Sequence, residues 1–297
     1  MISPPKSKYI INSWPSNDQF YIIDVMKEAK VVSVINQKGG VGKTTLCYHL
    51  AHALSNLNKK VLCIDFDPQA NLSYLFGRLA GDDENNDEID YSLFQLLINS
   101  IKELKHLHQG IFFNEIVSSV NKNIDLLPTS QDLSGFDLTV AGINFPRQLI
   151  LKKFFELNDI KKHYDYILID APPTLGLLVI NILCACDKLV IPIKADDFSF
   201  QGVKQFHKVL ESIDEMGIVK TPIISCYVPN LVDLRRKKEE MALNKFKEEY
   251  KEKVLKSISS SAVFVKAQAE KKSIFDYHSK DYTKWQNQFT EIANCIL

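Results

Sequence analysis

VVSVINQKGGVGKTT, residues 31–45, is the stretch of sequence that decides the fold of this chain. Its apolar, mostly β-branched beginning predicts a buried parallel strand, and leucines at positions 46, 50 and 54 continue at the spacing of a helix. Glycines at positions 39, 40 and 42 lie between the two predicted elements. Strand, glycine-rich loop and helix in this order are typical of a loop that binds phosphate groups.

The residue types in this loop indicate what it binds. Consecutive backbone N–H groups can approach phosphate oxygens closely only where glycines let the chain curl, and the N-terminus of the following helix attracts the anion. We expect Lys43 to place a positive charge on the β- and γ-phosphates and the Thr44 hydroxyl to ligate Mg²⁺. A glycine-rich turn that merely joins strand to helix is the alternative, but it leaves the lysine and the hydroxyls unexplained. The sequence therefore predicts a nucleoside triphosphate as ligand.

Two further predicted strands end in aspartate. Residues 60–65, KVLCID, are followed by Asp67, and residues 164–170, YDYILID, end at Asp170. Carboxylates at strand ends in a doubly wound sheet face the ligand crevice. We expect Asp170 to hold the metal through water, opposite Thr44. Of Asp65 and Asp67, one is expected to support the metal or the loop and the other to orient the attacking water, with an N-cap and turn role as the alternative.

The remaining apolar runs complete an α/β pattern. Three of them predict further strands, at residues 123–129, 187–194 and 221–230. Segments with helical spacing separate the strands, including residues 101–107. We therefore expect a doubly wound, mostly parallel sheet flanked by helices.

Length and composition fit one large soluble domain. We place this domain at residues 30–297, after an N-terminal extension at residues 1–29, and expect a mobile acidic loop at residues 81–90. The formal net charge is zero, which excludes a wholly basic nucleic-acid binder. The six cysteines lack the paired spacing of a metal site, and Cys184 and Cys186 fit a core better than a cluster. Without a signal sequence or a long apolar run, we expect a cytoplasmic protein with reduced thiols.

The C-terminal part of the chain is more basic than the rest. Residues 220–297 contain 15 basic and 10 acidic residues, and the run Arg235, Arg236, Lys237 and Lys238 opens a predicted helix at 231–256. Interleaved glutamates favour a solvated, salt-bridged face as the alternative to a DNA-binding surface. The last predicted helix, at residues 282–297, carries apolar side chains at helical spacing. We expect it to pack against the sheet, with a membrane-surface helix as the alternative.

A second lysine, Lys38, precedes the glycines, although an ordinary phosphate loop does not require it. KGGVGKTT, residues 38–45, resembles the deviant Walker A motif of the ATPase family that includes ParA, Soj, MinD and the nitrogenase iron protein. The resemblance implies that two protomers enclose ATP between them and that Lys38 reaches the phosphates of the partner, so that Lys38 and Lys43 are both catalytic. The ATP contacts that it implies in the loop are those of Lys38, Gly39, Gly40, Val41, Gly42, Lys43, Thr44 and Thr45.

Other segments carry the same resemblance. DFDPQ, residues 65–69, resembles switch I of the family, in which the second aspartate, here Asp67, is the hydrolytic residue, while Asp65 belongs to the metal site. Residues 171–173 resemble switch II. Pro229 and Asn230 are similar to the adenine-side segment, which implies a contact with the base, although an asparagine in a turn after proline is the alternative. The family commonly has glutamate and tyrosine where this chain has Asp196 and Asp197.

The resemblance extends over residues 30–297 and points to the ParA/Soj partition branch. It implies a DNA or plasmid segregation ATPase whose ATP-bound homodimer binds DNA without sequence preference, through basic residues such as those at 235–238. A ParB-type centromere-binding protein is expected to stimulate hydrolysis. The protein is then nucleoid-associated in a bacterial cytoplasm and needs no membrane. A membrane-recruited positioning ATPase like MinD and a metabolic synthetase of the same superfamily are the alternatives.

Overall fold

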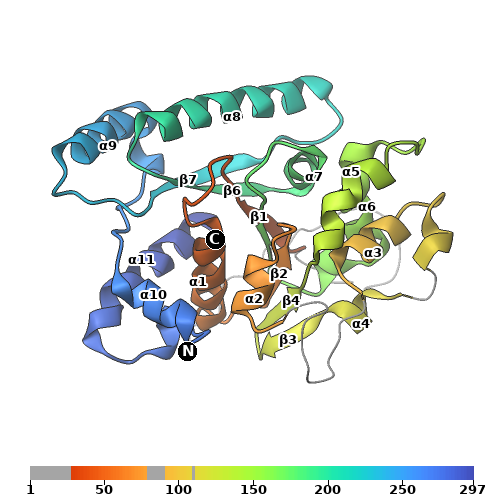
Figure 1. Ribbon diagram of the computed structural model, residues 1–297, viewed down its shortest axis with the longest axis horizontal. Coiled ribbons are helices and arrows are strands. Elements are labelled where there is room, and N and C mark those ends of the chain that lie inside the picture. The colour runs from red at the N-terminus through yellow and green to blue at the C-terminus, as the bar shows by residue number, and fades with distance from the viewer. Residues whose placement is uncertain (1–27, 79–90, 109–110) are drawn as a thin grey trace, which may run out of the picture.

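A seven-stranded sheet forms the centre of the protein, in a computed structural model that describes residues 28–78, 91–108 and 111–297 (Figure 1). The strand order is β3-β4-β2-β5-β1-β6-β7, and every neighbouring pair is parallel except β3 and β4. The doubly wound, mostly parallel sheet predicted from the sequence is therefore confirmed. The strands are β1 (Lys30–Val34), β2 (Val61–Asp65), β3 (Ser118–Asn121), β4 (Ile124–Leu127), β5 (Tyr166–Asp170), β6 (Lys188–Ile193) and β7 (Ile223–Pro229).

Helices cover both faces of the sheet (Figure 1). The larger ones are α1 (Lys43–Asn56), α3 (Leu93–Asn99), α6 (Ile150–Leu157), α7 (Leu177–Ala185), α8 (Asp197–Met216), α9 (Lys237–Tyr250), α10 (Ala262–Ala269) and α11 (Lys280–Ile296). Shorter helices are α2 (Asn71–Leu75), α4 (Phe113–Ile116) and α5 (Phe136–Thr139). Short 3₁₀ turns are η1 (Lys105–His108), η2 (Gln131–Gly135), η3 (Arg147–Leu149), η4 (Ile160–Lys162), η5 (Lys251–Lys253) and η6 (Ile274–Asp276).

The central strand β1 contributes to two hydrophobic cores. Successive side chains of a strand point to opposite faces, so Val31 packs in the core that contains residues of α3, α6, α7 and α8. Val32 and Val34 pack in the core formed with α1 and α11. Because both faces are covered by helices, the central strands are almost entirely apolar, with Ser33 of β1 as a buried polar exception.

The carboxyl ends of the central strands meet at one edge of the sheet. Pairing of β1 with β5 places Val34 beside Asp170, and pairing of β2 with β5 places Asp65 beside the same residue. Strands β5, β2 and β4 lie on one side of β1 in the sheet, whereas β6 and β7 lie on its other side. The direction in which strands are added to the sheet therefore reverses at β1. Such a switch point forms a crevice beyond the strand ends, and the glycine loop begins there.

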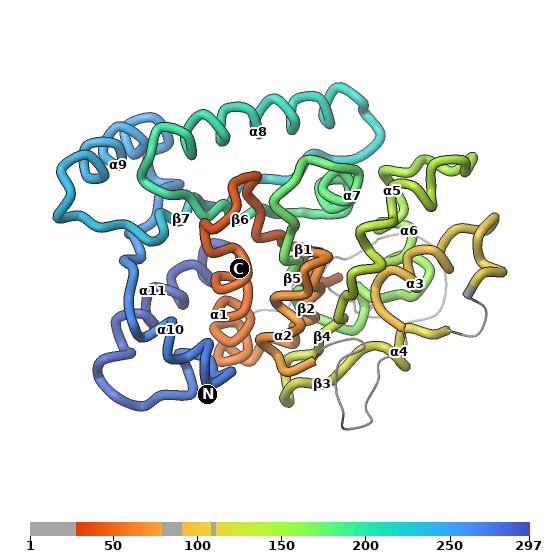
Figure 2. Tube along the Cα trace, viewed as in Figure 1, coloured from red at the N-terminus to blue at the C-terminus, as the bar shows by residue number. Residues whose placement is uncertain are grey.

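The C-terminal part of the chain packs beside the helix that follows the glycine loop. Figure 2 shows α10 and α11, in blue, next to α1, in red, and the two helices α1 and α11 are in contact. Trp285 and Phe289 of α11 are buried in a core that also contains side chains of α1 and β7, and α11 contacts β7, which confirms the predicted packing of the last helix against the sheet. Within the part of the chain that the structure describes, every helix is too short or too polar to span a bilayer.

Some predicted boundaries are wrong. The helix expected at 231–256 begins only at Lys237, because Leu231 has a left-handed backbone (φ 59°) and Arg236, directly before the helix, is extended. The helix ends at Tyr250, before the left-handed Lys251 (φ 48°). Only the 3₁₀ turn η1 forms within the helix expected at 101–107. Strand β3 was not predicted, since it is short, polar and half exposed.

Two predicted segments lie outside the described residues. They are the extension at 1–29, apart from its last two residues, and the acidic loop at 81–90. The division of the chain at residue 30 stays a prediction.

Candidate nucleotide-binding site

The glycine loop lies between β1 and α1, as the sequence predicted, and two of its glycines have backbone angles that other residues rarely adopt. Gly40 and Gly42 are left-handed, with φ of 66° and 86°, and α1 begins at Lys43, directly after Gly42. A Cβ atom on Gly42 would lie 2.3 Å from Nδ2 of Asn230. Both the backbone conformation and the lack of space therefore require glycine at position 42.

Lys43 brings a positive charge into a buried place. The residue is 7% exposed, and its Nζ lies 3.5 Å from the carbonyl oxygen of Lys38. Burial lowers the pKa of this ammonium, while the negative charges of Asp170 and Asp67 oppose the shift. An ammonium at the start of α1, in a loop of backbone N–H groups, is well placed for phosphate oxygens.

Asp170, at the end of β5, is fully buried, and neither of its carboxylate oxygens accepts a well-formed hydrogen bond from the described residues. Burial raises the pKa of Asp170 well above its usual range and the charge of Asp65 adds to the rise, while the nearby Thr44 hydroxyl and Lys43 ammonium oppose it. Mg²⁺ in such sites keeps several waters and takes one or two protein oxygens together with phosphate oxygens. Asp170 and Thr44 fit that donor set.

Asp65 is also fully buried, but its oxygens are engaged. One accepts hydrogen bonds from the backbone N–H of Ser73 (2.7 Å) and from its hydroxyl (2.8 Å), and the other accepts one from the N–H of Asp67 (3.3 Å). Burial raises the pKa of Asp65 to about 6 in spite of the bonds from Ser73. Asp65 thus fastens residues 65–73 to the end of β2. Its role in the metal site stays a prediction, and no sequence spacing pointed to Ser73.

Asp67 combines features of both of its predicted roles. It is 8% exposed, and its Oδ1 accepts a hydrogen bond from the N–H of Gln69 (3.0 Å), which is the turn contact given as the alternative. The negative charge of Asp67 also acts on the Lys43 ammonium, where it raises the pKa and so works against the lowering caused by burial. The structure therefore brings Asp67 near Lys43, the residue predicted to bind the phosphates. The hydrolytic role itself stays a prediction.

Asn230, at the end of β7, holds the glycine loop. Its Nδ2 donates to the carbonyl oxygen of Val41 (2.8 Å), its Oδ1 accepts from the N–H of Leu231 (3.0 Å), and its own N–H donates to the carbonyl oxygen of Ile193 (2.7 Å). No pattern in the sequence indicated this brace. The predicted contact of Pro229 and Asn230 with a base stays a prediction.

Two other side chains reach the loop from elements far away in the sequence. Nε2 of Gln268, in α10, donates to the hydroxyl of Thr45 at 2.6 Å. Nζ of Lys194, just after β6, lies 3.9 Å from the position that a Cβ on Gly40 would take. Contacts of this kind depend on the tertiary fold, so no local pattern indicates them.

The ammonium of Lys38 lies within its own chain. Its Nζ donates to Oδ2 of Asp196 at 2.6 Å and lies 3.3 Å from the hydroxyl of Ser199. Burial alone would raise the pKa of Asp196, but the hydrogen bonds from Lys38 and Ser199 hold it below its ordinary value. The structure thus gives Asp196, where the sequence departs from the family pattern, a direct contact with Lys38.

The basic run at 235–238 lies before and at the start of α9, which runs beside α8 in Figure 1. Arg235 Nε lies 2.8 Å from Oδ1 of Asp233, and an Nη atom of Arg236 lies 3.2 Å from Oε1 of Glu239. Arg235 and Arg236, two of the four basic residues of the run, therefore have carboxylate partners nearby in the sequence. This agrees with the alternative interpretation, a solvated face with salt bridges. DNA binding by this run stays a prediction.

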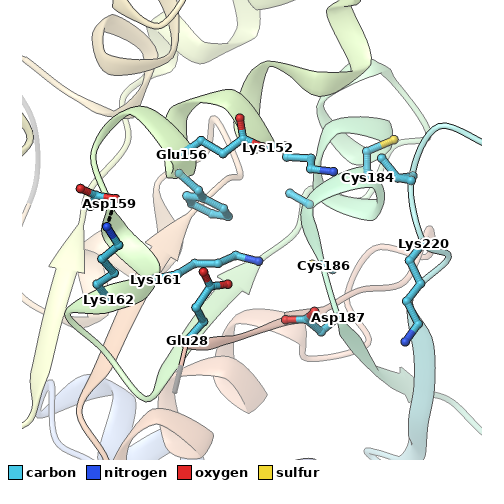
Figure 3. Close-up of a pocket in the computed structure, with 13 residues that line it drawn as sticks. Glu28, Lys152, Glu156, Asp159, Lys161, Lys162, Cys184, Cys186, Asp187 and Lys220 are labelled. Carbon is cyan, nitrogen blue, oxygen red and sulfur yellow. Dashed lines mark ion pairs between the residues drawn. The ribbon is translucent and has the colours of Figure 1, made fainter. Parts of the chain in front are cut away.

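A cavity of about 420 Å³ lies at the other edge of the sheet (Figure 3). Asp187 in its wall accepts a hydrogen bond from the N–H of Val31, near the amino end of β1 (2.8 Å). Its lining lysines are balanced by Glu28, Glu156, Asp159 and Asp187. Since doubly wound sheets bind ligands beyond the carboxyl ends of their strands, this cavity is not the nucleotide site.

Comparison of sequences places these features in a family. A family model described as an AAA domain matches residues 29–224. An uncharacterized protein of Methanocaldococcus jannaschii is 31% identical over 268 residues, which cover 90% of this chain and 98% of that protein. The sporulation initiation inhibitor protein Soj of Bacillus subtilis is 28% identical over 77% of this chain and 83% of its own length.

Solved structures share the fold. A putative plasmid partition protein from Borrelia burgdorferi bound to AMPPNP superposes with a TM-score of 0.71 at 25% identity, over 89% of this chain and 98% of that one. A variant of McdA from Cyanothece in complex with ATP gives 0.75 at 23% identity, over 91% and 97%. Cobyrinic acid a,c-diamide synthase from Mycobacterium smegmatis with ADP and magnesium gives 0.69 at 24% identity, over 90% and 93%.

Proposed function

This chain belongs to the ParA and MinD superfamily of ATPases, and from that premise we propose that it hydrolyses ATP with Mg²⁺ in order to segregate DNA. The observation that carries the nucleotide-binding part of the proposal is the meeting of Lys43, Thr44 and Asp170 at the carboxyl end of β1 and β5. A buried ammonium, a hydroxyl and a buried carboxylate without a well-formed hydrogen bond suit a ligand that is both anionic and metal-binding. A triphosphate with Mg²⁺ has those properties.

Each residue of the site has its own role in the proposed hydrolysis. Lys43 and the loop N–H groups bind the β- and γ-phosphates and stabilise the charge that develops on them. Asp67 orients a water molecule for attack on the γ-phosphate. When Mg²⁺ is bound, it neutralises charge on the phosphate oxygens. Thr44 and Asp170 would hold the ion.

In the proposed cycle, ATP joins two protomers, and Lys38 of each contacts the phosphates of the other. The dimer binds DNA without sequence preference through basic residues that include those at 235–238. A ParB-type centromere-binding protein stimulates hydrolysis and so releases the DNA, which makes the nucleotide a switch between two DNA affinities. The name of the Borrelia plasmid partition protein supports the partition role on which this cycle is built. The cycle puts the protein in the bacterial cytoplasm on the nucleoid.

One comparison tests this function. DNA binding is measured with ATP, with ADP and without nucleotide, for the native protein, for Lys43→Ala and for Lys105→Ala, an exposed control in η1. We expect ATP-dependent DNA binding in the native protein and in the control, and none in Lys43→Ala. The proposal is contradicted if DNA binding is the same with ATP, with ADP and without nucleotide, or if Lys43→Ala still binds DNA in the presence of ATP.

The two alternatives have their own readouts. A membrane-positioning ATPase like MinD sediments with liposomes in the presence of ATP, and burial of Trp285 and Phe289 against α1 speaks against α11 as its anchor. A synthetase responds to a small carboxylate substrate and not to DNA. The likeness to the cobyrinic acid synthase is one of fold, so it does not favour that activity.

A further inference from the structure

The ammonium of Lys38 is already engaged inside its own protomer. Its Nζ lies 2.6 Å from Oδ2 of Asp196, and the side chains of the two residues are 34% and 35% exposed. The hydroxyl of Ser199, a residue only 2% exposed, lies 3.3 Å from the same nitrogen. The Lys38 ammonium thus contacts two oxygen atoms at the start of α8, one from Asp196 and one from Ser199. In the proposed function the same ammonium contacts the phosphates of the other protomer.

The carboxylate of Asp196 has a fixed position. It caps α8, because its Oδ1 accepts a hydrogen bond from the N–H of Ser199 at 2.8 Å. Its own N–H donates to the carbonyl oxygen of Lys194 at 2.9 Å. The Asp196 carboxylate is therefore held at the start of α8. When the Lys38 side chain moves away, the carboxylate stays in place.

The backbone of Lys38 is held on the same side. Its N–H donates to Oδ1 of Asn36 at 2.9 Å, and Nδ2 of Asn36 donates to the carbonyl oxygen of Pro192, in β6, at 2.6 Å. The backbone of Lys38 is thus linked to β6 through Asn36, and its ammonium contacts Asp196 in the segment after β6. If the Lys38 side chain extends toward a second protomer, the contact with Asp196 has to break.

We propose that Asp196 is a positioning residue that retains Lys38 in its own protomer until the triphosphate of a second protomer displaces it. The inference rests on the proposed function, because it assumes that Lys38 acts across a dimer. A pair that is one-third exposed is weak, so a triphosphate with several negative charges can outcompete a single carboxylate. The contact thus disfavours the closed dimer without preventing it.

Asp196→Asn tests this restraint without removing the helix cap. Asparagine caps a helix about as well as aspartate, but it lacks the charge that pairs with Lys38. Asp197→Asn is the matched control, since it removes the same charge from the exposed neighbouring residue. Dimer formation with Mg²⁺ and ATP is measured by analytical ultracentrifugation, with all three proteins carrying Asp67→Ala to suppress turnover.

We expect Asp196→Asn to lower the dimer dissociation constant about two- to thirtyfold, because dimer formation breaks two partly exposed ion pairs, one in each protomer. We expect Asp197→Asn to leave the constant unchanged. An unchanged constant in Asp196→Asn overturns the proposal. A weaker dimer overturns it as well, because Asp196 then acts across the interface.

A second measurement separates failure of this inference from failure of the proposed function. Acylation of lysines by a soluble reagent, followed by mass spectrometry, reports how accessible Lys38 is in the nucleotide-free protein. We expect faster labelling of Lys38 in Asp196→Asn than in the native protein or in Asp197→Asn, since the carboxylate no longer shields the nitrogen. Equal labelling overturns the restraint. Faster labelling in a protein that never dimerises with ATP confirms the contact and refutes the dimer of the proposed function, and with it the assigned purpose of the restraint.

Discussion

The side-chain amide of Asn230 donates a 2.8 Å hydrogen bond to the carbonyl oxygen of Val41, and so the end of β7 braces a loop 189 residues earlier in the chain. The amide is buried, with the residue 7% exposed. A hydrogen bond inside a protein fixes its partners more firmly than one in water, so the loop conformation is set before any nucleotide arrives.

The first prediction concerns this brace. Asn230→Ala is expected to weaken ATP binding about fivefold while the protein stays folded, because a buried hydrogen bond that orders the loop contributes about 1 kcal/mol. Titration calorimetry with ATP gives the affinity and thermal unfolding checks the fold. An affinity equal to that of the native protein means that the brace does not order the loop.

The second prediction concerns Gly42. Gly42→Ala is expected to abolish ATP binding, since the new Cβ would lie 2.3 Å from Nδ2 of Asn230 and the residue has a φ of 86°. The double variant with Asn230→Ala removes the clash but keeps the backbone strain, which costs about 1–2 kcal/mol. We therefore expect it to regain part of the affinity. If the double variant binds ATP no better than Gly42→Ala, the clash is not the cause of the loss.

The third prediction concerns the proposed hydrolytic residue. Asp67→Ala is expected to bind ATP but to slow turnover about a hundredfold or more, because a positioned base contributes about that much. It should also trap the ATP-bound state on DNA. Single-turnover hydrolysis and DNA retention are the measurements, and turnover at the native rate refutes the role of this carboxylate.

The fourth prediction concerns pH and two histidines of α1, the buried His49 and the half-buried His52. Burial lowers the pKa of His49 to about 3 and that of His52 to about 4, with the charge of His52 adding to the first shift and that of Asp276 opposing the second. Nε2 of each ring is buried without a hydrogen-bond partner among the described residues. Since the folded pKa values lie below the unfolded value of 6.5, the stability that comes from the neutral rings is complete above pH 6.5 and is lost as the pH falls toward 4.

A histidine variant isolates this effect. His49→Gln is expected to reduce the acid-induced fall in the free energy of unfolding by about 1–2 kcal/mol between pH 6.5 and 4.5. The exposed His278→Gln is the control and should leave the slope unchanged. Urea unfolding at several pH values provides the slopes. Parallel pH profiles for His49→Gln and the native protein contradict the prediction, because His49 then has the same pKa in the folded and unfolded states.

The sequence predicted best what depends on neighbouring residues. The strand, loop and helix around Lys43 follow from local residue types, and Asp170 could be placed because buried parallel strands are apolar throughout and end together. The same reasoning could not find the contacts of Asp65 with Ser73, or of Lys38 with Asp196, because each joins a loop to a residue whose position only the tertiary fold determines. The predicted start of α9 is wrong for a related reason, since nothing in the sequence shows that Leu231 is left-handed and Arg236 extended.

The hydrogen bond from Gln268 to Thr45 bears on how this protein can be divided. The family model ends at residue 224, so a fragment cut there lacks Gln268, Asn230 and the helix α11 that buries one side of α1. Such a fragment keeps every residue of the glycine loop but loses the supports that hold the loop and its helix in place. We therefore expect deletion from the C-terminus to weaken nucleotide binding, although the deleted residues lie far from the loop in the sequence.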